Sequence, residues 1–310
     1  MKNIIYACSS KNKPIGGVKV IHRHSEILNR IGMNSEVLYN YGKNNTVDWF
    51  EHNARIKYDR KFEPGRDIVI LPECLIFDLW KTLENAGVEY GIFVQNGYLV
   101  SKNIRPDEID ACYASAKSII CISEDAMRCV RSFFPDASKK LIRVIYSVNQ
   151  KIFFPSERKE NIITYMPRKQ KSHSDLLIPT LHRKLPKGWK IEPIDGMTEV
   201  QVAAALSKSK IFLAFSDFEG LPVPPVEAAL CGNFVIGYTG QGGKEYWQAP
   251  IFTEIESGDI VDFLEKTLCK VNQIEESGIK VNEEDLNWIK SHFSDHHEIQ
   301  LLRGMLAAIV

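Results

Sequence analysis

Short apolar runs alternate with amphipathic stretches along almost the whole sequence, and this alternation restricts the fold more than any other feature. In the first half, apolar runs predict strands at 3–8, 35–39, 67–71, 91–95, 118–123 and 143–146. Helical periodicity predicts helices between them, at 18–31, 77–85, 107–116 and 124–133. Continuously apolar strands that alternate with helices are typical of a parallel sheet covered on both faces. The sequence therefore predicts an α/β protein.

The second half repeats this alternation after a polar, proline-containing stretch at 149–159, which we interpret as a linker. Its predicted strands are 162–165, 190–193, 211–214, 234–237 and a run near Ile251. Its predicted helices are 175–185, 198–206, 225–230, 260–271, 283–292 and 296–309. We therefore expect two Rossmann-like domains, 1–150 and 151–310, that face each other across a cleft. The last helix is a candidate to cross back to the first domain.

Composition excludes some classes of function. Lys and Arg together number 39, as do Asp and Glu, so the net charge is zero and a nucleic-acid partner is not expected. The N-terminal apolar run is too short for a signal peptide, and no run reaches the roughly 18 apolar residues of a membrane-spanning helix. We expect a cytoplasmic protein, with a peripheral contact at the inner membrane surface left open. The seven cysteines lack C-x-x-C pairs, which predicts reduced, mostly buried thiols without zinc.

The strongest motif is the segment 215–232, in which a strand leads through a Gly- and Pro-rich loop into a helix. Pro224 or Pro225 suits the first helical position, which places Glu227 in the first turn and Glu219 upstream in the loop. A carboxylate can accept two adjacent hydrogen bonds, as a ribose diol would donate, and free N–H groups at a helix start favour a phosphate. The alternative is that both glutamates are solvated acids at a helix entry.

This segment resembles the signature of glycosyltransferase family 4, whose members have the GT-B fold. The residues that carry the resemblance are Glu219 and Glu227 in E-x7-E spacing, followed by Ala228-x-x-x-Gly232 and a strand. The resemblance implies a retaining transferase that uses a nucleotide sugar. It implies that Glu227 binds the donor ribose, that Glu219 lies near the donor sugar or its phosphates, and that Gly220 and Leu221 contact the donor.

A basic segment follows the first strand of the second half. In the family, an Arg and a Lys at this place contact the donor diphosphate; here Arg168 is the candidate Arg, and Lys171 or Lys169 the candidate Lys. Fixed cations would stabilise the negative charge that grows on a diphosphate leaving group. The family's usual glycine before the Arg is Pro167 in this chain. A solvated basic turn is the alternative.

Two glycine pairs also match the family. Gly242 and Gly243 follow a strand, where glycine would let the backbone approach the donor phosphates or sugar closely. Gly16 and Gly17 lie between the first strand and the first helix, where the family places a loop close to the donor phosphates and the acceptor. Plain turns are the alternative at both places.

Other features depart from the family or exclude particular chemistry. The stretch 92–98 lacks the histidine that many members carry there, and neither Gln95 nor Asn96 can act as a general base. No D-x-D metal motif is present, and His22 and His24 would point to different faces of a helix. We expect no metal and no separate cofactor, because the nucleotide sugar is a substrate. The resemblance favours front-face attack in which the leaving phosphate takes the acceptor's proton.

Together these features predict transfer of a sugar from a UDP-, GDP- or dTDP-sugar to a glycan or lipid-linked saccharide acceptor, with retention, as in polysaccharide biosynthesis. Two alternatives stay open. A nucleotide-sugar epimerase of the same architecture would change the donor sugar without an acceptor. A non-catalytic protein that binds sugar nucleotides or glycans would bind the donor without turnover.

Overall fold

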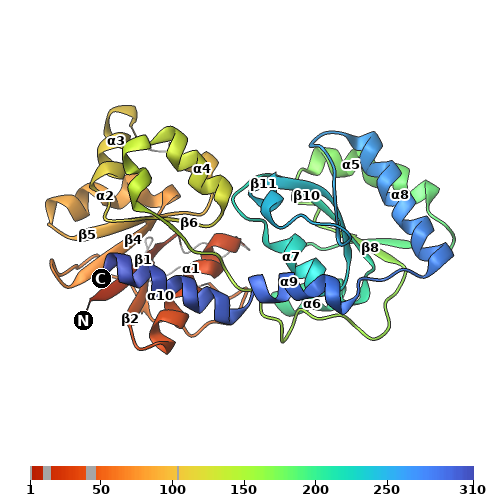
Figure 1. Cartoon of the computed structure of the whole chain (residues 1–310), viewed down its shortest axis with the longest axis horizontal. Coiled ribbons are helices and arrows are strands. Elements are labelled where there is room, and N and C mark those ends of the chain that lie inside the picture. Colours follow the sequence, from red (N-terminus) through yellow and green to blue (C-terminus); the bar gives the residue numbers. More distant parts are fainter. Residues whose placement is uncertain (1, 10–14, 40–46, 103–104) are drawn as a thin grey trace. The chain divides into compact units, whose positions relative to one another are not determined.

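The computed structural model of the chain describes residues 2–9, 15–39, 47–102 and 105–310. The chain divides into two compact units: unit 1 is Met1–Tyr146 with His296–Val310, and unit 2 is Ser147–Asp295. Each unit has a parallel sheet with helices on both faces (Figure 1). The predicted α/β class with two Rossmann-like units is confirmed.

Unit 1 contains a seven-stranded parallel sheet in the order β3-β2-β1-β4-β5-β6-β7. The strands are β1 (Asn3–Cys8), β2 (Asn34–Tyr39), β3 (Ile56–Lys57), β4 (Asp67–Pro72), β5 (Glu89–Val94), β6 (Ile119–Cys121) and β7 (Leu141–Arg143). The helices are α1 (Gly16–Arg30), α2 (Ile76–Asn85), α3 (Pro106–Ser115), α4 (Glu124–Phe133) and α10 (Asp295–Ile309). Figure 1 shows α2, α3 and α4 on one face and α1 and α10 on the other. Burial of the sheet on both faces explains why all six residues of β1 and of β4 are buried.

Unit 2 contains a five-stranded parallel sheet in the order β12-β11-β10-β8-β9. The strands are β8 (Ile162–Tyr165), β9 (Lys190–Pro193), β10 (Ile211–Glu219), β11 (Phe234–Gln241) and β12 (Phe252–Glu254). The helices are α5 (Lys171–Lys184), α6 (Glu199–Lys208), α7 (Val223–Leu230), α8 (Ile260–Ser277) and α9 (Glu283–His292). Helices α5 and α8 lie on one face, and α6, α7 and α9 lie on the other (Figure 1).

Local sequence signals explain where several of these helices begin and end. The Ser123 hydroxyl accepts from the backbone N–H of Ala126 and caps α4. Thr198 starts α6 with a reciprocal capping box. Gly278, with a left-handed φ of 62°, ends α8, which is six residues longer than its predicted range.

The last helix packs in unit 1 although it follows unit 2 in the sequence. Leu302, Met305 and Ile309 of α10 are fully buried, and the Tyr6 hydroxyl in β1 lies 3.8 Å from the Met305 sulfur. The buried Glu298 carboxylate lies 3.4 Å from the guanidinium of Arg23 in α1. The predicted range 151–310 for the second domain is therefore wrong at its end, because an apolar face of α10 covers the first sheet.

Two other predictions need correction. The apolar residues 144–146 are buried but lie outside β7, which ends at Arg143, so burial here does not reflect a strand. The predicted linker 149–159 packs against unit 2. Phe153 is 1% exposed, and the Gln150 side chain donates to the Lys290 carbonyl over 2.7 Å. A polar composition alone does not distinguish a linker from a covering segment.

All seven cysteines are free thiols, and five are buried as predicted, whereas Cys74 and Cys269 are exposed. Within the described ranges, no helix is long and apolar enough to cross a membrane.

Candidate functional site

The strand order of unit 2 places a topological switch point between β8 and β10. These strands are neighbours, but the chain continues from β8 to β9 on one side and from β10 to β11 on the other. In open parallel sheets, ligands bind beyond the carboxyl ends of the strands at such a point. The predicted basic segment follows β8 directly, and Glu219 is the last residue of β10. The fold therefore brings two of the sequence-predicted regions to one edge.

Lys169 and Glu219 meet at this edge. The Lys169 ammonium donates to a Glu219 carboxylate oxygen in an ion pair between segments 50 residues apart. The two side chains are 35% and 26% exposed, so solvent and a ligand can both reach the pair. Next to it, the Gln170 amide donates to Asp217 over 2.8 Å and fixes the loop that leads into α5. Glu219 ends a strand and does not lie in a loop as predicted.

Backbone strain concentrates at the same edge. In the part of the chain that the structure describes, the non-glycine residues with positive φ are Gln170 (42°), Phe218 (48°) and Gln241 (61°). The Phe218 N–H donates to the Gln241 side-chain oxygen over 2.9 Å, which ties β10 to the end of β11. Left-handed backbone at non-glycine residues costs free energy and clusters at functional sites. Its occurrence in the loop before α5 and at the ends of β10 and β11, beside the Lys169–Glu219 pair, marks this edge as a candidate site.

The glycines at the end of β11 and just after it are explained first by packing within unit 2. A Cβ at Gly242 would lie 1.6 Å from the carbonyl oxygen of Gly220, so only glycine fits. Gly240 has a φ of 66°, and a Cβ there would meet the Cβ atoms of both Glu219 and Ser216 at 2.9 Å. The predicted reason for these glycines, close approach to a donor, is thus not required for Gly242. A Cβ at Gly243 would meet no atom closer than 3.3 Å.

Helix α7 begins one or two residues earlier than predicted. Val223 is its first residue and Pro222 its N-cap, which places Pro224 second and Glu227 fifth. Glu227 therefore lies beyond the first turn, and its side chain is only 7% exposed. The buried Tyr246 hydroxyl donates to the Pro222 carbonyl over 2.7 Å and holds the start of α7 against the loop after β11.

The remaining predicted cations differ in their surroundings. Arg168 is exposed in the middle of the loop between β8 and α5. Lys171 is already the first residue of α5, and its ammonium lies 2.6 Å from Asp175, with both side chains more than half exposed. The structure thus brings Lys169, and not Lys171, into contact with Glu219.

A small hollow of about 20 Å³ lies beside the Lys169–Glu219 pair. Its walls come from the loop after β8, from β10 and from the proline-rich start of α7, including Pro222 and Pro224. Space of this size suits about one water molecule. A nucleotide sugar would have to lie over this hollow and not inside it.

Unit 1 has its own switch point, between β1 and β4, and three chain segments meet there. Gly16 and Gly17 open α1 after β1, as predicted, and Glu73 follows β4. The Gln95 amide donates to the Gly17 carbonyl over 2.9 Å, and the Gln95 N–H donates to a Glu73 carboxylate oxygen over 3.0 Å. The Gly17–Gln95–Glu73 chain of hydrogen bonds therefore connects the first loop to the ends of β4 and β5.

Glu73 gives a pH-dependent prediction. Its side chain is 4% exposed, and burial raises its pKa from 4.5 to about 7, against the lowering effect of backbone N–H donors. Folding then favours the protonated acid, and this contribution is complete below pH 4.5 and is lost as the pH rises to about 7. Relative to Glu73→Gln, the wild type should lose about 2–3 kcal/mol of unfolding free energy between pH 4.5 and 8. Urea denaturation of both proteins across this range measures the difference; parallel curves would contradict the prediction.

The buried histidines of α1 have structural contacts. His22 lies 2.8 Å from the Val18 carbonyl and 2.9 Å from the Tyr39 hydroxyl, and burial lowers its pKa to about 4. His24 lies 3.4 Å from Glu298. In the described ranges, no group of three or more His, Cys, Asp or Glu side chains is placed to hold a metal ion.

Several residues that shape the site are not predicted from the sequence. No sequence pattern singles out Gln170, Asp217, Phe218 and Gln241, whose importance comes from contacts between segments distant in sequence. Their position directly after predicted strands was the available signal, because strand ends at one edge of a parallel sheet meet.

Comparison with known proteins identifies the fold. No protein-family model and no curated protein matches the sequence. Three similar solved structures are HepE from Anabaena in complex with UDP-glucose, sucrose-phosphate synthase from Thermosynechococcus elongatus and the lipopolysaccharide outer core galactosyltransferase WaaB.

Their TM-scores are 0.74, 0.72 and 0.69, with 9%, 13% and 16% sequence identity. The matches cover 99%, 99% and 100% of this chain, respectively, and 100% of each matched chain. Both α/β units, each with a parallel sheet, are included in these matches, and the chain has the GT-B fold of these proteins.

Proposed function

We propose that this protein is a glycosyltransferase of the family 4 type that transfers a hexose-like sugar from a nucleotide sugar. The observation that carries the proposal is the Lys169–Glu219 pair at the switch point of unit 2, close to three non-glycine residues with left-handed backbone. The fold is compatible, because HepE and WaaB share it and the HepE structure contains UDP-glucose. Fold alone does not define function, so the proposal depends on the site.

Each predicted residue has a place in this proposal. Arg168 and Lys169 hold the donor diphosphate, because both follow β8 at the edge where ligands bind. The Lys169 ammonium already binds a carboxylate, that of Glu219, and phosphate oxygens can take the place of this group. Lys171, paired with Asp175, contributes less direct charge attraction from the start of α5. Glu227 receives the ribose hydroxyls.

The other residues would line the donor sugar. Glu219 would accept hydrogen bonds from sugar hydroxyls once the phosphates take over Lys169. Gly220, Leu221 and Gly243 form the adjacent wall, and Gly242 keeps that wall in place.

Unit 1 presents the acceptor in this proposal, through the loop at Gly16 and Gly17 that Gln95 holds. The acceptor is a glycan or lipid-linked saccharide, and the reaction takes place on the cytoplasmic side, at a membrane surface where the acceptor is lipid-linked. The acceptor oxygen forms the new bond to the anomeric carbon as the bond to the diphosphate breaks. The leaving phosphate takes the acceptor's proton on the same face, which retains the anomeric configuration. Cations and backbone N–H groups stabilise the departing charge without a metal.

A donor screen tests the proposal. The protein is incubated separately with UDP-glucose, GDP-mannose and dTDP-glucose, each with and without a mixture of saccharide acceptors. The nucleoside diphosphate that is released is measured. Acceptor-dependent release from one donor supports the proposal. An altered sugar nucleotide with donor alone would instead show an epimerase, and tight binding without turnover would show a binding protein.

Glu227→Ala should weaken donor binding by about 1–3 kcal/mol, because a buried carboxylate would lose its hydrogen bonds to the ribose. Isothermal titration with the donor from the screen measures this change. Glu283→Ala is the control, because Glu283 lies at the exposed start of α9 and pairs only with Lys290 among the contacts seen. Equal affinity of the wild type and Glu227→Ala would remove the ribose assignment.

A further inference from the structure

Unit 1 contains a hollow that the proposed function does not use. Its volume is about 360 Å³, and it lies between the second half of α1 and the segment just before β3. Arg55 in its wall donates to Asn34, the first residue of β2, over 2.9 Å. The hollow is therefore at the amino end of the sheet, whereas Gly16 and Gly17 lie beyond the carboxyl end.

Arginines dominate the lining of this hollow. Arg23 and Arg30 come from α1, and Arg55 comes from the segment before β3. Glu26 is the acidic side chain among the lining residues, so the lining carries three positive charges and one negative charge. A Glu298 carboxylate oxygen in α10 lies 3.4 Å from the Arg23 guanidinium and offsets part of its positive charge. Among the residues that line the hollow, positive charges therefore outnumber negative ones.

The walls are held by hydrogen bonds. A Glu26 carboxylate oxygen accepts from the backbone N–H of Asn53, which joins α1 to the opposite wall. The Asn29 amide donates to the carbonyls of Ser25 and Ser35 over 2.9 and 2.8 Å. These bonds tie α1 to the segment before β3 and to β2, so the walls of the hollow are in place before a ligand binds.

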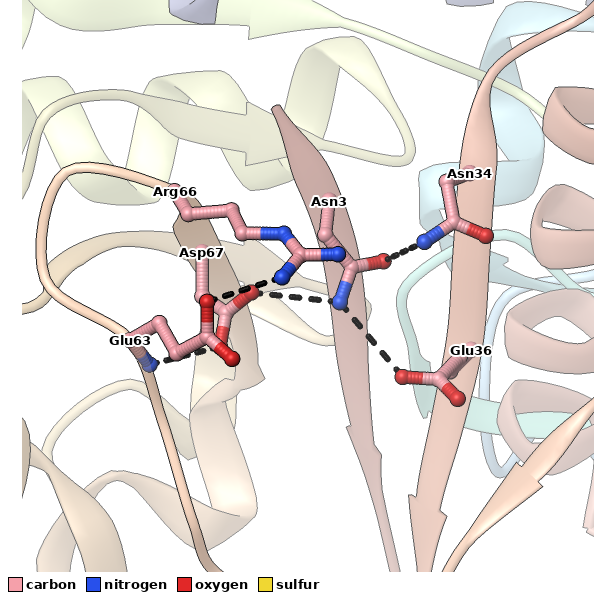
Figure 2. A network of polar contacts seen from close by, with 6 residues as sticks. All are labelled: Asn3, Asn34, Glu36, Glu63, Arg66 and Asp67. Carbon is pink, nitrogen blue, oxygen red and sulfur yellow. Dashed lines mark hydrogen bonds and ion pairs between the residues drawn. The ribbon is translucent and has the colours of Figure 1, made fainter. Parts of the chain in front are cut away.

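Arg55 donates to Asn34, which belongs to the polar network drawn in Figure 2. Its partner Asn34 donates to the Asn3 side chain over 2.9 Å, and Asn3 donates to Asp67 over 3.2 Å. Asn3 and Asp67 are 8% and 5% exposed. The partner of Arg55 is therefore rigid, and the guanidinium keeps other N–H groups to offer to a ligand.

We propose that this hollow binds the oxyanion of an acidic sugar, either a carboxylate or a phosphate on a sugar-sized molecule. Arginine presents planar pairs of N–H donors that match two oxygens of a carboxylate or phosphate. The volume falls within the range of about 300–1,000 Å³ found for small-molecule sites. An isolated phosphate would leave most of it unfilled. The site is independent of the proposed donor site, which belongs to unit 2.

Four probes separate the parts of this proposal: glucuronate, glucose 6-phosphate, glucose and inorganic phosphate, each titrated into the full-length chain by calorimetry. At least one of the two acidic sugars should bind. Tighter binding of glucuronate would identify a carboxylate site, and tighter binding of glucose 6-phosphate would identify a phosphate site. Glucose should not bind, and inorganic phosphate should bind at least tenfold more weakly than the acidic sugar. Equal binding of glucose, or of phosphate alone, would overturn the proposal.

Variants locate the binding. Arg30→Ala and Arg55→Ala should each weaken the acidic sugar about tenfold, as expected for loss of a charge-assisted hydrogen bond. Glu26→Gln should strengthen it about threefold, because it removes the opposing charge while keeping an acceptor for Asn53. Arg66→Ala is the control, because Arg66 pairs with Glu63 in the network of Figure 2 and does not line the hollow.

Opposite effects of Arg55→Ala and Glu26→Gln exclude a general loss of structure. Unchanged affinity in both arginine variants, with melting temperatures equal to wild type, would contradict the site. UDP-glucose affinity should be the same in all these variants. If UDP-glucose fails to bind any of them while glucuronate or glucose 6-phosphate still binds, the donor proposal fails and this one stands.

Discussion

Gly242→Ala should destabilise unit 2 by about 3 kcal/mol, lower its melting temperature by roughly 10 °C and abolish donor binding. The new Cβ would lie 1.6 Å from the Gly220 carbonyl oxygen and 3.0 Å from that of Glu219. Both contacts are with backbone, which cannot rotate away as a side chain can. The loop that carries Glu219 and Gly220 would have to separate from the end of β11.

Gly243→Ala is the matched control for this prediction. It adds the same methyl group one residue later, where the nearest atoms are the Tyr246 hydroxyl at 3.3 Å and Pro222 at 3.5 Å. Its effect on stability should stay below about 1 kcal/mol. Differential scanning calorimetry measures both variants. Similar melting temperatures for Gly242→Ala and the wild type would show that the two loops are not packed this closely.

Lys169→Ala should weaken nucleotide-sugar binding by about 30-fold to 100-fold, more than expected for loss of one phosphate contact. The substitution removes a cation and also leaves the Glu219 carboxylate without that partner at the edge where the diphosphate would bind. Like charges a few ångströms apart repel, so the second effect adds to the first. Isothermal titration with the donor identified in the screen measures the change.

A double variant separates the two effects. Lys169→Ala combined with Glu219→Gln removes the unpaired charge and should recover about a tenfold part of the lost affinity. Lys171→Ala is the matched control, because it removes the same charge two residues away, where the partner is the exposed Asp175. Its effect should be threefold or less. Equal losses of affinity for Lys169→Ala and Lys171→Ala would contradict the prediction and favour the alternative that this segment is a solvated basic turn.

The sequence predicts the central strands of both sheets because those strands are apolar and buried, whereas the two-residue edge strand β3 is not predicted. β1 appears at its predicted residues for this reason. α4 also appears at its predicted residues, and Ser123 caps its start. The prediction of a strand at 143–146 is wrong because the same apolar character also marks residues buried outside the sheet.

The site is only partly predictable because its geometry comes from contacts between distant loops. Lys169 and Glu219 could each be proposed from a motif, but no pattern indicates that they pair. The reason for glycine at 242 lies in the carbonyl of Gly220, 22 positions earlier. Sequence order likewise does not reveal that Gln95 connects Gly17 to Glu73.

A crystal structure of the full chain soaked with UDP-glucose tests the central claim most directly. The account predicts that the diphosphate oxygens lie within hydrogen-bond distance of Lys169 and Arg168, with the ribose hydroxyls on Glu227. The Lys169–Glu219 pair should open as the phosphates replace the carboxylate. Density for UDP-glucose elsewhere, with Lys169 and Glu219 still paired and Glu227 away from the ligand, would contradict the account.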